Sequence, residues 1–349
     1  KMMSYNEALG KLIKNYRSIA VAGTHGKTTT ATMLSNVFGK TVGTSYLIGD
    51  GNGFCNKDSE YFVFEACEYK RHFLAYHPTH AIITNVDFDH VDYYKDLDDV
   101  KSAFIEFINQ TKEKVVIYGK DNPIKKPNDK IITYGFEDTN DVYAKDIVKT
   151  SSGVEFTYCT KDNIEYRFSL PIYGEHNLLY ALAVITVCLL EGISLEDIEA
   201  QFKTYTGPKR RFEIIETENN IVIDDYAHHP IEIRGLFEMT KQKYPDKELV
   251  AVFEPHTYSR TERFLNEYAK VLDLFDYLHI CPIYGSPREP KGNITTEEIL
   301  AKIPKAEYLT MDTISKLAKY KDKVILFFGC AVAPYTKKYL EEVANKKDH

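Results

Sequence analysis

The sequence has no tryptophan, and only 18 glycines and 13 prolines occur among its 349 residues. So little glycine and proline excludes a collagen-like or low-complexity chain. The length exceeds that of an ordinary single domain, and 44% of the residues are hydrophobic. The composition therefore predicts two folded domains, each with a core of its own.

Closely spaced cysteine pairs are also absent. The six cysteines lie far apart, without the spacing typical of disulfide-stapled secreted domains or of zinc sites. We interpret them as free thiols of a cytoplasmic protein; they are Cys55, Cys67, Cys159, Cys188, Cys281 and Cys330.

No apolar run is long enough to span a bilayer, since the longest extends only from Tyr180 to Leu190. The net charge of −7 argues against a general affinity for nucleic acids or anionic membranes. We expect a soluble protein without nucleic-acid or membrane partners, either a monomer or a weak homo-oligomer. The chain begins at Lys1 without the features of a signal peptide.

Short apolar segments alternate with helical patterns, which is typical of a mostly parallel α/β sheet. One series runs from Arg17 to Val142, and turn residues between Val142 and Phe168 predict antiparallel strands before a helix over 177–191. Thr206-Gly207-Pro208 is the candidate linker. A second series follows, with strands expected over 221–225, 249–254, 277–282 and 324–328. The predicted domains are therefore 1–206 and 207–349.

The strongest local motif lies where the first predicted strand turns into a helix. Its glycines allow backbone N–H groups to close around phosphate oxygens, its lysine can reach the terminal phosphates, and a hydroxyl can bind Mg²⁺. The motif predicts a phosphate-binding loop formed by Gly23, Thr24, His25, Gly26, Lys27, Thr28 and Thr29.

Carboxylates and a histidine follow the neighbouring strands. Glu65 and Glu68 end one strand, and the segment Thr84 to Asp92 ends the next with His90 in an acidic cluster. Because the carboxyl ends of parallel strands share one sheet edge, Glu65 and His90 are candidate magnesium ligands. A solvated strand-end carboxylate and a surface histidine are the alternatives.

Two further motifs lie near the expected domain junction. At Gly174-Glu175-His176-Asn177 a helix begins, where Asn177 could cap the helix while its amide pairs with a base edge; capping alone is the alternative. Lys209-Arg210-Arg211 forms a basic cluster that would clamp a triphosphate, unless it is only a solvated run of charge.

In the second series, polar segments follow two strands, from Asp224 to Pro230 and from Glu254 to Arg260. Ligands of open α/β sheets bind at the carboxyl ends of strands. These two segments therefore predict a site for a second substrate.

Taken together and in order, these motifs resemble those of the Mur ligase family, in particular its alanine-adding branch. The resemblance extends over nearly the whole chain; the motifs are GTHGKTTT at Gly23, EACE at Glu65, TNVDFDHVD at Thr84, GEHN at Gly174, GPKRRF at Gly207, DDYAHHP at Asp224 and EPHTYSR at Glu254. It implies a central P-loop ATPase domain and a C-terminal Rossmann-like α/β domain. The family's N-terminal UDP-binding domain is expected to be missing from this chain, and with it most of the UDP-sugar site.

The resemblance implies an ATP- and Mg²⁺-dependent ligase that adds L-alanine to UDP-N-acetylmuramate through an acyl phosphate. Lys27, Glu65, His90, Arg211 and His228 match the family's catalytic positions, and Thr28, Glu65 and His90 match the metal ligands. His176 and Asn177 match the adenine side, and Asp225 matches the acid near the ribose. Arg211, or its neighbour Arg210, matches the arginine on the nucleotide phosphates. Tyr226, His256 and Arg260 match the alanine pocket.

The sequence departs from the family pattern at three places. Phe104 occupies the region where later-acting relatives carry a carbamylated lysine, Thr257 stands where many members have arginine, and 329–334 lacks the expected glycine-rich turn. Three rival functions remain: a recycling ligase that adds a murein peptide, a P-loop phosphotransferase, and an ATP-binding module without catalysis.

Overall fold

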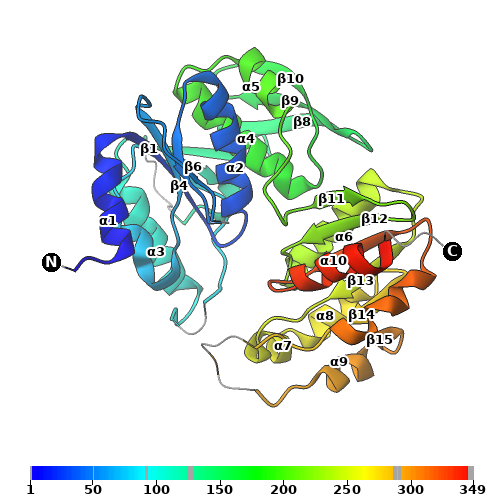
Figure 1. The fold of residues 1–349 in the computed structure, drawn as a ribbon. Coiled ribbons are helices and arrows are strands. Elements are labelled where there is room, and N and C mark those ends of the chain that lie inside the picture. Colours follow the sequence, from blue (N-terminus) through cyan, green and yellow to red (C-terminus); the bar gives the residue numbers. More distant parts are fainter. Residues whose placement is uncertain are drawn as a thin grey trace. The chain divides into compact units, whose positions relative to one another are not determined.

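The computed structural model describes residues 2–49, 51–90, 93–123, 129–285, 289 and 292–344. The chain forms two compact units, Lys1–Pro208 and Lys209–His349. The first unit thus ends at Pro208, the last residue of the candidate linker. Each unit is described by itself (Figure 1).

A ten-stranded sheet forms the centre of the first unit, in the order β10-β9-β8-β7-β6-β5-β1-β4-β2-β3. The strands from β8 to β7, β6, β5, β1, β4 and β2 run parallel, whereas β3, β9 and β10 pair antiparallel with their neighbours. Their bounds are β1 Arg17–Ala22, β2 Ser45–Leu47, β3 Gly53–Phe54, β4 Tyr61–Glu65, β5 His80–Ile83, β6 Lys114–Tyr118, β7 Ile131–Gly135, β8 Val142–Thr150, β9 Gly153–Thr160 and β10 Glu165–Leu170. The predicted parallel series and the antiparallel segment after Val142 are confirmed.

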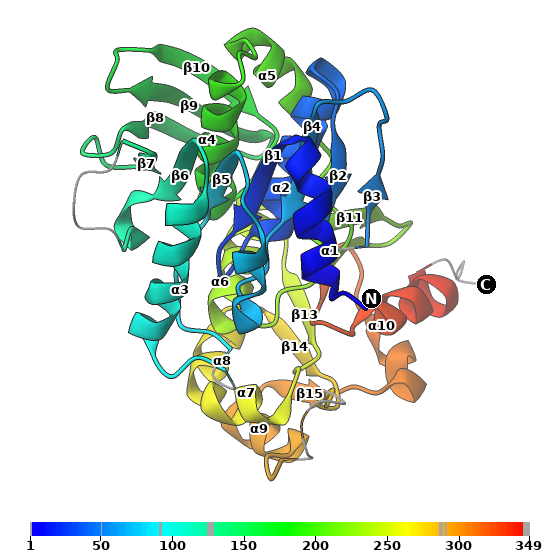
Figure 2. The ribbon, with the colours of Figure 1, turned by 90° about the vertical axis from the view of Figure 1, so that its left-hand side faces the viewer.

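Helices cover both faces of this sheet, because successive side chains of a strand point to opposite faces. Ile19 and Val21 of β1 belong to the core beneath α2 and α4, whereas Ala20 and Ala22 belong to the core beneath α1 and α3. Figure 1 shows the two helix pairs on opposite sides of β1 and β4, and Figure 2 gives the view turned by 90°. The helices are α1 Tyr5–Leu12, α2 Lys27–Thr41, α3 Leu97–Gln110, α4 Glu175–Leu190 and α5 Leu195–Phe202, with 3-10 turns at Ile13–Asn15, Tyr69–Ala75 and Gly119–Asp121.

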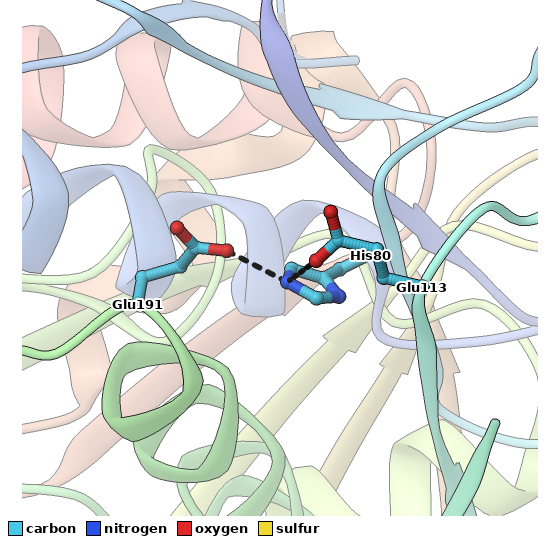
Figure 3. A group of neighbouring side chains, drawn as sticks. All are labelled: His80, Glu113 and Glu191. Carbon is cyan, nitrogen blue, oxygen red and sulfur yellow. Dashed lines mark hydrogen bonds and ion pairs between the residues drawn. The ribbon is translucent and has the colours of Figure 1, made fainter. Parts of the chain in front are cut away.

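An ion cluster closes the amino edge of the sheet, where the central strands begin. His80 Nε2 lies 2.7 Å from Glu191 Oε1 and 3.6 Å from Glu113 Oε2 (Figure 3). Such a group of ligand atoms is typical of a cation site, but the Arg17 guanidinium donates to both carboxylates, at 2.6 Å to Glu191 and 3.1 Å to Glu113. The Tyr61 hydroxyl donates to Glu191 as well. The arginine already supplies the positive charge, so we interpret the cluster as structural.

The second unit contains a six-stranded sheet in the order β11-β12-β16-β13-β14-β15, in which only β11 is antiparallel to its neighbour. Its strands are β11 Glu213–Glu216, β12 Ile221–Asp225, β13 Leu249–Phe253, β14 Tyr277–Ile280, β15 Ala306–Tyr308 and β16 Val324–Phe328. Its helices are α6 Pro230–Lys243, α7 Tyr258–Arg263, α8 Leu265–Leu272, α9 Thr296–Lys302 and α10 Ala333–Tyr339, with a 3-10 segment at Met311–Lys319 and a π-turn at Leu340–Ala344. The predicted fold class, mixed α/β with mostly parallel sheets, is confirmed.

Asp225, Phe328 and Phe253 are aligned in the register of β12, β16 and β13. The polar segments after these strands therefore start at one sheet edge. No helix in the described ranges combines the length and the apolar character needed to cross a membrane. All six cysteines lie in described ranges, and each is unpaired.

Candidate active site

The phosphate-binding loop joins the end of β1 to the start of α2, and two of its positions require glycine. Gly23 has φ 134° and Gly26 has φ 82°, conformations that side chains rarely adopt. A Cβ atom on Gly23 would lie 2.0 Å from the Thr84 hydroxyl, and one on Gly26 would lie 2.2 Å from the Tyr180 ring. Gly26 also precedes α2 without a side-chain cap. The first N–H groups of this helix are therefore available for an anion.

The segment after β5 holds this loop in place. The His25 N–H donates to Asn85 Oδ1 at 2.9 Å, and the His25 carbonyl accepts from the Thr84 hydroxyl at 2.6 Å. The Thr24 hydroxyl accepts the Asp87 N–H at 3.0 Å. The loop after β1 and the segment after β5, 60 residues apart in the sequence, are therefore joined by hydrogen bonds. The last two residues of the second motif, 91 and 92, lie outside the described residues.

Lys27 lies in the first turn of α2, with its ammonium turned back onto the loop. Its Nζ donates to the Gly23 carbonyl at 2.6 Å and to Glu68 Oε2 at 3.0 Å. Burial opposes the charge of Lys27, but the Glu68 carboxylate outweighs it and raises the pKa of the lysine. The loop thus keeps a charged ammonium beside its backbone N–H groups.

Glu68 is the residue that the sequence analysis did not single out. It follows Glu65 by three positions, and two acids at one strand end were the only signal. Its side chain is 2% exposed and also lies 3.3 Å from His90 Nε2. Burial opposes the ionised form of Glu68, but Lys27 and His90 outweigh it and hold its pKa below the ordinary value. Glu68 therefore links the predicted phosphate lysine to the predicted metal-side histidine.

The three predicted magnesium ligands come from three elements at the same carboxyl edge. Thr28 is the second residue of α2, Glu65 is the last residue of β4, and His90 lies in the segment after β5. The Glu65 carboxylate accepts the Gly49 N–H at 2.6 Å. A hydroxyl, a carboxylate and an imidazole, next to a loop suited to phosphate, fit a hard divalent cation that is shared with a nucleotide. Their role as ligands stays a prediction.

Asn177 does not cap α4, contrary to one of the two expectations for it. The helix begins at Glu175 with Gly174 as its N-cap, and the Asn177 amide donates to the Tyr173 carbonyl at 2.8 Å. The His176 ring lies 5.9 Å from the ring of Tyr180, the residue against which Gly26 packs. The start of α4 is therefore close to the phosphate-binding loop, and the predicted adenine contact remains untested.

In the second unit, the two arginines of the basic cluster have different surroundings. The Arg210 guanidinium donates to Asp224 Oδ1 at 3.0 Å and to the carbonyls of Gly329 and Cys330 at 2.7 and 2.9 Å. The Arg211 guanidinium lies 4.8 Å from the centre of the Tyr226 ring. Arg210 therefore holds the fold of this unit together, which leaves Arg211 as the candidate for a phosphate.

Asp225 is buried at the end of β12 and accepts two backbone N–H groups, from Phe212 at 2.6 Å and from Ala227 at 2.7 Å. Burial raises its pKa to about 6, although Arg211 and these two hydrogen bonds oppose the shift. Asp225 thus organises the turn that carries the following residues. Its predicted ribose contact stays a prediction.

The remaining predicted residues meet at the carboxyl ends of β12 and β13. His228 lies 5.6 Å from the Tyr226 ring and 6.1 Å from the His256 ring, centre to centre. Arg260 NH1 lies 3.4 Å from His256 Nδ1. Burial, helped by His228 and Arg260, lowers the pKa of His256 to about 4, and burial also lowers that of His228. The structure therefore places a guanidinium beside neutral imidazoles, a setting suited to a small carboxylate.

Tyr284 is a second residue that the sequence analysis missed. Its ring stacks on His256 with a centroid distance of 5.8 Å and an interplanar angle of 19°. It lies in the loop after β14, where no motif signals it. Tyr284 and Arg260 thus contact the same imidazole.

Two family models match the chain. That of the Mur ligase middle domain matches residues 21–188, and that of the Mur ligase glutamate ligase domain matches residues 210–343. The chain belongs to the Mur ligase family.

Known members of the Mur ligase family resemble the chain over nearly all of its length. A UDP-N-acetylmuramate–L-alanine ligase of Lactobacillus delbrueckii subsp. bulgaricus is 44% identical over 349 aligned positions. The match covers 99% of this chain and 80% of the relative. The crystal structure of the UDP-N-acetylmuramate–alanine ligase MurC of Thermotoga maritima has a TM-score of 0.82 and 26% identity, over 97% of this chain and 77% of that one. A murein peptide ligase of Psychrobacter arcticus shares the fold, with a TM-score of 0.69 and 23% identity, over 99% and 82%.

The structure shows the surroundings of the three departures from the Mur ligase pattern. Phe104 is fully buried in α3, 5.2 Å from the Phe73 ring, so this position belongs to the core. Thr257 adopts φ 68° immediately before α7. The turn at 329–331 is held by Arg210 on one side and by the Glu254 carboxylate, which accepts the Ala331 N–H at 2.9 Å, on the other.

Proposed function

We propose that this chain is an ATP-dependent ligase that joins L-alanine to the lactyl carboxylate of UDP-N-acetylmuramate, a step in the synthesis of peptidoglycan precursors. The observation that carries the proposal is the 44% identity, over 99% of the chain, to a ligase of that name. A phosphate-binding loop in one unit and a guanidinium–imidazole pocket in the other support it. A simple phosphotransferase would not need the second pocket.

The reaction has two steps. In the first, the bond between the γ-phosphorus of ATP and its bridging oxygen breaks, a bond forms to a carboxylate oxygen of the sugar substrate, and ADP leaves. In the second, the amine of L-alanine attacks the acyl carbon, phosphate leaves, and the amine loses a proton as the amide forms. Neither step requires a nucleophilic side chain of the protein.

We assign the phosphoryl group to the phosphate-binding loop, where Lys27 and the start of α2 stabilise the charge that develops in the transition state. Thr28, Glu65 and His90 would hold magnesium, which when bound neutralises phosphate charge. Arg211, Asp225 and His228 are proposed to contact the nucleotide from the second unit. His176 and Asn177 are proposed for its adenine side.

We assign the L-alanine carboxylate to Arg260, because a planar guanidinium can pair with both carboxylate oxygens at once. His256 orients this guanidinium at 3.4 Å and is neutral, so it adds no competing charge. Tyr226 lies beside His228 and Tyr284 stacks on His256, and the two tyrosines would enclose the methyl group. We also expect the protein to act in the cytoplasm, because its thiols are unpaired.

The test uses the full-length protein encoded by the gene and measures phosphate release in the presence of ATP and Mg²⁺. Release should require both L-alanine and UDP-N-acetylmuramate, and mass spectrometry should identify their amide as the product. A murein tripeptide in place of alanine tests the recycling activity. Phosphate release that requires neither L-alanine nor UDP-N-acetylmuramate would contradict the proposal. Amide formation with the tripeptide but not with L-alanine would contradict it as well.

A further inference from the structure

The chain makes a strained turn immediately after β4. Lys70 and Arg71 follow each other with φ 52° and φ 58°, the left-handed region that residues other than glycine seldom adopt. Arg71 NH2 fixes the turn to α3, at 2.7 Å from Asp99 Oδ1 and 2.9 Å from the Ser102 hydroxyl. Backbone strain of this kind is concentrated at functional sites. The two residues before the turn, Glu68 and Tyr69, both contact His90.

His90 is held from two sides by this turn. Its Nε2 lies 3.3 Å from Glu68 Oε1, and its ring centre lies 4.7 Å from that of Tyr69. The Tyr94 hydroxyl in turn donates to the Glu68 backbone carbonyl at 2.5 Å, which fixes the backbone of Glu68. Histidines that bind metals commonly donate their second ring N–H to a carboxylate. With Nε2 occupied in this way, Nδ1 is the ring nitrogen left for a cation.

The same carboxylate limits the charge of the phosphate lysine. Glu68 Oε1 and Oε2 lie 3.3 and 3.0 Å from Lys27 Nζ in a setting where the carboxylate is 2% and the lysine 17% exposed. An anion that approaches Lys27 therefore meets a charged ammonium whose field is partly offset by a buried carboxylate.

We propose that Glu68 is the positioning residue of the nucleotide site, which orients His90 toward a divalent cation and offsets the charge of Lys27. The inference rests on the proposed function, because it takes Lys27 and His90 as the phosphate and metal groups. With Glu68 in this position, the nucleotide should bind weakly without metal, and tight binding should require the divalent cation. Loss of the Glu68 charge should change these two properties in opposite directions.

The experiment measures the affinity for ADP by calorimetry, once in EDTA and once in saturating Mg²⁺. The proteins are wild type, Glu68→Gln, Glu68→Asp and the control Glu155→Gln, which removes an exposed carboxylate on β9. Glu68→Gln should bind ADP in EDTA about threefold more tightly or better, because the charge opposing the phosphates is gone. The enhancement of binding by Mg²⁺ should fall at least about tenfold, because His90 loses its partner.

Glu68→Asp separates the two effects, since it keeps the charge but withdraws the carboxylate. It should show the smaller Mg²⁺ enhancement without tighter binding in EDTA, and Glu155→Gln should behave as wild type. Unchanged values in Glu68→Gln, only one of the two changes, or weaker binding in both conditions together with a lower melting temperature would overturn the inference. If Glu68→Gln does not fold, an unchanged Mg²⁺ enhancement in Glu68→Asp overturns it. Wild-type protein that binds no ADP in either condition contradicts the proposed function itself.

Discussion

Among single residues, Lys27 combines a proposed catalytic role with a structural one. Replacing Lys27 by alanine removes a transition-state contact worth about 3 kcal/mol, so turnover should fall by about a hundredfold or more. The structure adds a cost that the sequence does not indicate, since the buried Glu68 carboxylate then loses the ammonium that lies 3.0 Å away. We expect a loss of about 1–3 kcal/mol in the free energy of unfolding.

The double variant Lys27→Ala/Glu68→Gln separates these effects. It should recover most of the lost stability in a urea titration, because no unpaired carboxylate remains, and it should stay inactive. Ligation at the wild-type rate in Lys27→Ala would contradict the assignment of the phosphate-binding loop.

Arg260 tests the amino-acid pocket at the same scale. A methyl group contributes only about 0.8 kcal/mol on burial, so most of the affinity for L-alanine must come from its carboxylate. Arg260→Lys loses the two-pronged contact and should raise the KM for L-alanine at least about tenfold, with the KM for ATP nearly unchanged.

Arg263→Lys is the matched control, because Arg263 lies on the same helix, α7, with its guanidinium 5.4 Å from the Phe264 ring centre. Both KM values should stay at the wild-type level in this variant. An unaltered KM for L-alanine in Arg260→Lys would mean that another group holds the carboxylate.

On the scale of one element, substitution by alanine should have opposite effects on stability at two glycines of α2, its N-cap Gly26 and Gly39 within the helix. At Gly26, a methyl group meets the Tyr180 ring at 2.2 Å and φ is 82°, so Gly26→Ala should lower the free energy of unfolding by about 2 kcal/mol or more. At Gly39, which is exposed within the helix, nothing lies within 4 Å of the added carbon. Gly39→Ala should stabilise the protein by about 0.5–1 kcal/mol. Chemical denaturation measures both changes, and a Gly26→Ala variant as stable as wild type would contradict the close approach.

The elements most accurately predicted are those with the strongest apolar runs. The strands Ile221–Asp225 and Val324–Phe328 have the predicted bounds, because each is bordered by polar or turn residues. The strands Ser45–Leu47, Gly53–Phe54 and Ile131–Gly135 were not predicted. The first two are too short for periodicity to be visible, and pairing with neighbouring strands stabilises all three.

For the candidate site, too, the sequence predicted the positions of motifs but not the contacts between side chains. Motif spacing predicted a phosphate-binding loop and placed acids and histidines at strand ends, because topology brings strand ends together. It could not show that Glu68 rather than Glu65 contacts Lys27, since both acids follow the same strand and only the folded geometry distinguishes them. It also placed the start of this helix at Asn177, although the helix begins at Glu175 after Gly174, which adopts φ 81°.

At the scale of the whole molecule, the ion cluster at the amino edge ties the first unit together and makes its stability depend on pH. Burial opposes ionisation of Glu191, but hydrogen bonds from His80, Arg17 and Tyr61 outweigh it and lower its pKa to about 2. The folded pKa lies below the ordinary value of 4.5. The cluster's contribution of about 3 kcal/mol is therefore present above pH 4.5 and is lost as the pH falls toward 2.

Glu191→Gln should consequently be less stable than wild type at pH 7, and the difference should shrink steadily below pH 4.5. Denaturation at a series of pH values measures this difference. The control is Glu165→Gln, which removes an exposed partner of Lys145 on β10 and should change little at any pH. A stability difference for Glu191→Gln that is independent of pH would contradict the lowered pKa.

The hydrogen bonds of Arg210 decide to which unit the basic cluster belongs. This one guanidinium fastens the residues after Pro208 to β12 and to the turn after β16, both in the second unit. Proteolysis between Thr206 and Pro208 would therefore leave the phosphate-binding loop on one fragment and both arginines, still anchored, on the other. A chimaera of two relatives joined at residue 209 would therefore receive Arg211 together with Tyr226, His256 and Arg260, the residues that we propose for the alanine site.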